Sequence, residues 1–210
     1  GARAHSHGRQ PVDTVLAYAM PAERRYDAGP LTVEDFQAEV PEPLPRVGRF
    51  RQFALADTDI RYQIEYRYRK TSDGVEASLK DIDIYAIFLS DKSWIAPAGV
   101  KALDHEQGHF DISQMYALDA KLQMKSRLHD GKSLIGKGAS RDEAISDLQR
   151  QVNEFLKPLR DRVDSAQKEY DRQTNHGLLA ASQAVHRKRQ LELLKELIAD
   201  LEKLATSDEP

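Results

Sequence analysis

The feature that most constrains the fold is a change of hydrophobic period near the middle of the chain. Between Ile60 and Tyr68, aliphatic and aromatic residues alternate with charged and polar ones, which is the period of a half-buried β-strand. From Val100 onward, apolar residues recur every three or four positions, as on one face of an α-helix. A chain with strands first and helices afterwards is typical of the α+β class, and we predict that class.

The strand region is expected to fold back on itself as an antiparallel sheet. Ser72-Asp73-Gly74 has the composition of a hairpin turn, because Gly74 is free to adopt a positive φ. The residues from Val75 to Leu89 then supply the return strand or strands. Residues 1–29 mix His, Arg, Pro and Gly with one short apolar stretch, so we treat them as an N-terminal arm and residues 30–210 as one domain.

Three helices are predicted after the sheet. The first runs from about Val100 to Leu128 and contains the apolar positions described above. The second begins at Ser140-Arg141-Asp142-Glu143, which has the pattern of a capping box, and we expect it to bend at Pro158. Asn175-His176-Gly177 ends the second helix, and residues 178–204 form the third.

Composition limits the classes of partner. The chain has 34 acidic and 31 basic side chains and a net charge of -3, so it lacks the basic field that attracts nucleic acid. No segment approaches the roughly 18 consecutive apolar residues of a membrane-spanning helix. There is no Cys, which excludes disulfides and Cys-ligated metal sites. A chain of 210 residues can bury roughly 70% of its unfolded surface, so a monomer is expected.

The segment His105-Glu106-Gln107-Gly108-His109 is an H-E-x-x-H motif within the first predicted helix. Residues four apart lie one turn apart on the same face of a helix, so both imidazoles can reach one metal ion. Glu106 lies about 100° round the helix and can approach the open position of the metal without becoming a ligand. The motif therefore predicts a zinc hydrolase, with His105 and His109 as ligands and Glu106 as the general base.

A catalytic zinc site usually has a third protein ligand. The candidates are His5, His7, His129, His176, His186, Glu154, Asp161 and Asp171. His129 is excluded because twenty residues along one helix place it about 30 Å from His109. Counting back from the capping box places residues 154–164 level with His109, which favours a carboxylate. Tyr170 is either a donor to the developing oxyanion or a core residue, and Asp111 or Asp171 could orient a ligand His.

Two blocks of sequence together resemble one known family. They are Leu103-Asp104-His105-Glu106-Gln107-Gly108-His109-Phe110-Asp111-Ile112 and Tyr170-Asp171-Arg172-Gln173-Thr174-Asn175-His176-Gly177, preceded by Ser93-Trp94-Ile95. With these blocks, most of the chain from about Leu31 resembles a bacterial family of unknown function described as predicted secreted zinc-dependent proteases. The resemblance implies a zincin-like metallopeptidase domain with one zinc ion on His105, His109 and His176, a peptide or protein substrate, and an extracytoplasmic location, periplasmic or secreted.

Two other functions fit the same residues. The domain could be a non-catalytic binding domain that a metal ion stabilises, in which case a closed shell of four protein ligands is expected. It could also be a zinc hydrolase of amides that are not peptides. A tightly held zinc ion with an open coordination position favours an enzyme over the binding domain, but it does not separate the two kinds of hydrolase.

Overall fold

The computed structural model describes residues 13–15, 22–48 and 50–206, and its centre is a long antiparallel hairpin. Strand β6 (Thr58–Thr71) pairs along its whole length with β7 (Gly74–Leu89). The two strands are joined through Ser72 and Asp73, and Gly74 has a φ of +138°. The predicted alternating strand and the predicted turn are therefore confirmed.

Short strands extend this hairpin on both sides. The bounds of the short strands are Asp13–Val15 (β1), Glu23–Arg25 (β2), Arg46–Val47 (β3), Phe50–Arg51 (β4), Ala54–Leu55 (β5), Trp94–Ile95 (β8) and Ile135–Gly138 (β9). Strand β1 pairs with β6, while β2 and β9 pair with opposite ends of β7. The pairs β3–β4 and β5–β8 are separate. Strands β1 and β2 belong to the predicted arm, so this part of the arm joins the sheet.

Three long helices follow the hairpin, which confirms the α+β class. Their bounds are Leu103–His129 (α1), Arg141–Thr174 (α2) and Ala180–Thr206 (α3), and 3₁₀ helices cover Tyr26–Ala28 (η1), Val33–Asp35 (η2), Ser90–Lys92 (η3) and Pro97–Ala102 (η4). At the start of α2, the Ser140 hydroxyl accepts the Glu143 backbone N–H at 3.3 Å. The Glu143 carboxylate accepts the N–H of Ala139 at 2.8 Å, and α2 continues through Pro158.

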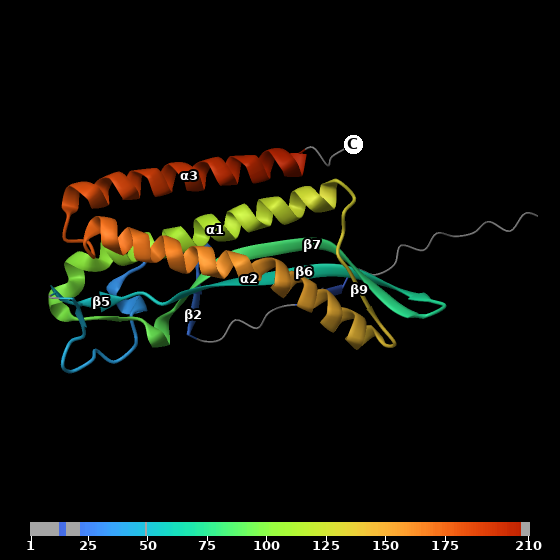
Figure 1. The fold of residues 1–210 in the computed structure, drawn as a ribbon, viewed down its shortest axis with the longest axis horizontal. Helices are drawn as coiled ribbons and strands as arrows, with labels where there is room; N and C mark the ends of the chain where they lie inside the picture. The colour runs from blue at the N-terminus through green and yellow to red at the C-terminus, as the bar shows by residue number, and fades with distance from the viewer. Residues whose placement is uncertain (1–12, 16–21, 49, 207–210) are drawn as a thin grey trace, which may run out of the picture.

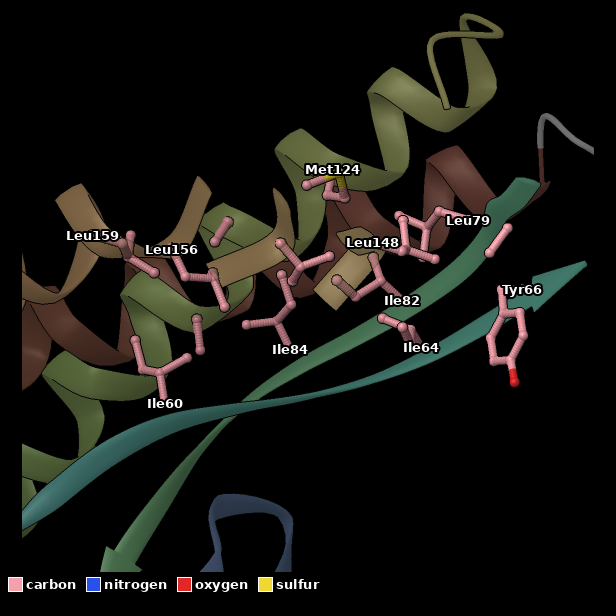
Figure 2. Packing of buried hydrophobic residues seen from close by; sticks show 14 of the residues in the cluster. Ile60, Ile64, Tyr66, Leu79, Ile82, Ile84, Met124, Leu148, Leu156 and Leu159 are labelled. Carbon is pink, nitrogen blue, oxygen red and sulfur yellow. The ribbon is translucent and has the colours of Figure 1, made fainter. Parts of the chain in front are cut away.

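The main core lies between the hairpin and the first two helices, as Figure 2 shows. The contributing side chains alternate along β6 and recur at helical spacing on α1 and α2, whereas on β7 the alternation shifts by one residue between Leu79 and Ile82, at a β-bulge. Those labelled in the figure are Ile60, Ile64, Tyr66, Leu79, Ile82, Ile84, Met124, Leu148, Leu156 and Leu159. This packing fixes α1 and α2 against one face of the sheet.

Helix α3 lies on α1, on the side away from the sheet (Figure 1). The start of α1, the end of α2, the start of α3 and β5 meet at one end of the molecule, opposite the tip of the hairpin (Figure 1). Four segments that are distant in sequence therefore meet there. Within the described residues, no helix carries an apolar stretch long enough to cross a membrane.

Candidate metal centre

A cleft of about 440 Å³ opens at the end of the molecule where these segments meet. Helix α1 contributes His105, Glu106 and His109 to its wall, and α2 contributes Asp171. His176 joins them from the turn that follows α2. All the site residues predicted from the H-E-x-x-H motif and from the resemblance therefore line one cleft.

Three side chains in this cleft are arranged as a metal ion requires. The Nε2 atoms of His105 and His109 are 3.2 Å apart. The Oδ1 atom of Asp171 lies 2.9 Å from the first nitrogen and 3.1 Å from the second. Ligand atoms held 2.0–2.1 Å from a tetrahedral zinc ion are roughly 3.3 Å apart. These three residues can therefore hold a metal ion with little movement.

The charges of this group also favour a cation. Burial alone would raise the pKa of Asp171, but hydrogen bonds to His105 and His109 hold that pKa well below its ordinary value. Burial would likewise lower the pKa of His109, but the hydrogen bond to Asp171 and the negative charges of Glu106 and Asp171 raise it. The carboxylate thus stays ionised beside the two imidazoles, so the group stabilises a positive charge between them.

Glu106 is buried beside the three residues and does not belong to their group. Its Oε2 atom accepts the backbone N–H of Ala56 at 2.8 Å, directly after β5. Burial raises the pKa of Glu106, although the nearby charges of His109 and His105 act in the opposite direction. The bond to Ala56 holds the carboxylate in place through Oε2. The other oxygen, Oε1, takes no part in this bond, so it can accept a proton.

His176, the third ligand implied by the resemblance, lies beside Asp171 and outside the group of three. Its Nδ1 atom is 3.3 Å from Asp171 Oδ1, and its side chain is one-third exposed. The turn that carries it is unusual, because Asn175, His176 and Gly177 have φ angles of +49°, +52° and +79°. Two consecutive non-glycine residues with positive φ carry backbone strain of a kind that is often retained at functional sites.

The part of α2 that lies beside His109 is further along the helix than helix counting predicts. Residues 154–164 were expected level with His109, but Asp171 contacts it. The connection after α1 is not compact, because the chain first runs along the hairpin as β9 before α2 begins. Each additional residue of α2 that this detour requires moves the level by about 1.5 Å.

The other candidate ligands do not belong to this group. Glu154 accepts a hydrogen bond from Arg150 at 2.6 Å on the surface of α2. His186 packs edge-on against Tyr170, with ring centroids 5.6 Å apart. His129 is the last residue of α1, which is unbroken from Leu103, and neither it nor Asp161 lines the cleft. His5 and His7 lie outside the described residues.

Tyr170 is a packing residue of the site. Its ring stacks on His105 at an interplanar angle of 13° and meets His109 edge-on. Its hydroxyl is buried against α1 at Gly108, and the residue does not line the cleft. Tyr170 therefore holds the two imidazoles from behind, and it is not placed to donate to an oxyanion. Asp111 pairs with Arg187 and accepts a hydrogen bond from Tyr26, so it orients neither imidazole.

We predict that Gly108→Ala destabilises the protein, although Ala is the better helix former. A Cβ atom at position 108 would overlap the hydroxyl and ring carbons of Tyr170. Overpacking of this kind costs about 1–3 kcal/mol, whereas the gain in helix propensity is only about 1 kcal/mol. Thermal unfolding measures the change. Part of the loss should be recovered in Gly108→Ala/Tyr170→Leu relative to Tyr170→Leu alone, and full additivity of the two changes would contradict this explanation.

No protein-family model, curated protein or solved structure matches this chain. The functional assignment therefore depends on the contacts within the cleft. Any function assigned to this protein has to explain why two imidazoles and one carboxylate lie together with a buried glutamate beside them.

Proposed function

We propose that the protein is a zinc-dependent metallopeptidase with one zinc ion on His105, His109 and Asp171 and with Glu106 as the general base. The observation that carries this proposal is the spacing of three ligand atoms at 2.9, 3.1 and 3.2 Å beside a carboxylate outside the group. Three protein ligands are typical of catalytic zinc sites, whereas structural sites usually have four.

The chemistry of the donors supports zinc as the metal. Imidazole nitrogens combined with one carboxylate oxygen suit zinc better than calcium or magnesium, which prefer oxygen ligands. A bound zinc ion would lower the pKa of a water molecule and polarise a substrate carbonyl. The side chains of the chain then have to move protons and hold the substrate.

The proposal assigns the proton transfer to Glu106. We assign Oε1 as the atom that accepts a proton from the attacking water, while the Ala56 N–H holds Oε2. The same carboxyl group then delivers this proton to the amide nitrogen as the C–N bond breaks. The rise in the pKa of Glu106 caused by burial suits a group that must both accept and release a proton.

The mouth of the cleft favours a peptide over a small amide. Four exposed apolar side chains lie around it, and they come from both sides of the site. They are Val47, Phe53, Leu55 and Leu178, with 38–60% of each residue exposed. An extended peptide can cover several such side chains at once, whereas a small amide reaches only the innermost ones. We therefore assign peptides with apolar side chains as the substrate class.

Metal removal tests the proposal. The purified protein is expected to bind one zinc ion per chain and to hydrolyse internally quenched peptides rich in apolar residues. A chelator should abolish hydrolysis, and stoichiometric zinc should restore it, with metal content measured by mass spectrometry. Zinc binding without hydrolysis of any peptide would favour the non-catalytic binding domain. Hydrolysis of small amides alone would favour the other class of hydrolase.

A further inference from the structure

Helix α3 contacts the proposed ligand His105 through the buried side chain of Gln183. The Oε1 atom of Gln183 lies 3.1 Å from His105 Nδ1, and its Nε2 atom donates to Asp104 Oδ2 at 2.9 Å. An ionised carboxylate can only accept, so the amide NH₂ must face Asp104 and the carbonyl must face the imidazole. Nδ1 of His105 therefore carries a proton and donates it to Gln183.

This hydrogen bond determines what the other nitrogen of the ring can do. With the proton on Nδ1 of neutral His105, Nε2 carries the lone pair. That atom faces Asp171 Oδ1 at 2.9 Å and His109 Nε2 at 3.2 Å. A nitrogen lone pair and a carboxylate oxygen repel each other, so this contact between Nε2 and Oδ1 needs a positive charge between the two atoms. A metal ion bound to both atoms would supply that charge.

We propose that Gln183 is a positioning residue that fixes the tautomer and ring orientation of His105 so that Nε2 is presented to the metal. The inference depends on the proposed role of His105 as a ligand. Histidine ligands in metal sites usually donate their second N–H to a protein acceptor, and loss of that acceptor typically lowers metal affinity by about 10–100-fold. Here the acceptor comes from a helix that supplies no ligand itself.

Other contacts hold Gln183 in this position. Arg187, one turn further along α3, donates to Asp104 Oδ1 at 3.1 Å and also pairs with the buried Asp111. Gly177 allows the preceding turn to approach, because a Cβ atom there would lie 3.0 Å from His105 Cβ and 3.5 Å from Gln183 Oε1. The start of α3 is thus fixed to the first turns of α1, and the carbonyl of Gln183 is fixed with it.

The test compares Gln183→Leu with Gln190→Leu. The first change removes the acceptor of the Nδ1 proton, so we expect zinc affinity to fall by about 10–100-fold. Gln190 is a matched control, because it is also buried on α3 and donates to α1, but to the backbone oxygen of Gly108 at 3.3 Å. Its replacement should change zinc affinity by less than about threefold. Isothermal titration with zinc chloride measures both affinities.

The tautomer provides a second readout that needs no metal. In the metal-free protein, where a proton on Nε2 can fill the contact with Asp171, ¹⁵N chemical shifts should show that Nδ1 of His105 is also protonated in the wild type, and Gln183→Leu should reduce the population protonated at Nδ1. The double variant Gln183→Glu/Asp104→Asn exchanges the amide and the carboxylate and keeps both hydrogen bonds. We expect it to restore the proton on Nδ1 and an affinity within about threefold of the wild type.

These outcomes separate the two proposals. Weak zinc binding by Gln183→Leu with recovery in the double variant supports the positioning role. Unchanged affinity and tautomer in Gln183→Leu, with zinc bound by the wild type, would overturn the role of Gln183 and leave the peptidase proposal intact. Failure of the wild-type protein to bind zinc would overturn both proposals. If Gln183→Leu does not fold, a wild-type His105 without the Nδ1–H tautomer would still overturn the positioning role.

Discussion

Replacement of Glu106 by Gln is expected to leave zinc binding intact and to reduce the rate of peptide hydrolysis by about 10²–10⁴-fold. The amide has nearly the same shape as the carboxylate, and its oxygen can still accept the N–H of Ala56. It cannot accept the proton of the attacking water. Zinc titration and kcat measured on the same preparation check the two halves of this prediction.

Glu154→Gln is the matched control for this experiment. Glu154 lies on the surface of α2, where it pairs with Arg150, and it does not line the cleft. We expect both zinc affinity and kcat of this variant to match the wild type. Undiminished hydrolysis by Glu106→Gln would remove Glu106 from the mechanism, whereas loss of zinc from that variant would indicate that the carboxylate is a ligand.

The second large effect is expected at the third ligand. Asp171→Ala removes an oxygen that lies within 3.1 Å of both imidazole nitrogens, so we expect zinc affinity to fall by more than about 100-fold. His176→Ala removes only a neighbour of that carboxylate, at 3.3 Å, and we expect a loss of about tenfold. Equilibrium titration of each variant with zinc against a chelator of known affinity measures both losses.

Asp164→Ala is the control for the loss of charge. Asp164 is an exposed carboxylate on the same face of α2 and lines the same cleft, but it is outside the group of three. Its removal should leave zinc affinity nearly unchanged. The reverse ranking, with a large loss in His176→Ala and a small one in Asp171→Ala, would make His176 the third ligand, as the family resemblance implies.

The sequence predicts the parts of the fold that depend on local pattern. The alternation from Ile60 to Tyr68 predicts β6, because each residue on one face of a strand meets the same layer of the core. The capping residues at Ser140 and Glu143 predict the start of α2, because the exposed amides of a first turn need acceptors nearby. In each case the interacting residues are close in sequence.

The elements that the sequence misses depend on tertiary contacts. Strand β9 contains two glycines in four residues, a composition that opposes strand formation. In the structure, Gly136 and Gly138 have no room for a Cβ atom, because α2 packs directly on them. The detour along β9 also explains why helix counting favoured residues 154–164 over Asp171.

In the candidate site, too, the sequence predicts the residues that are close together along the chain and misses those that tertiary packing brings together. The spacing of His105, Glu106 and His109 is a local property of one helix, so the sequence reveals it directly. Asp171 could be included among several candidates, but only the packing of α2 against α1 selects it. Gln183 carries no signal in the sequence, because its role follows from the docking of α3 and an amide is an ordinary residue on a helix surface.

The order of the segments along the chain affects when the proposed enzyme can become active during translation. His105 is synthesised 78 residues before the glutamine that holds its ring. A nascent chain that stops between these two points contains the complete H-E-x-x-H motif without the helix that orients it. Under the proposed roles, zinc affinity stays about 10–100-fold below its final value until α3 has left the ribosome, so the hydrolytic activity of the growing polypeptide would stay low until then.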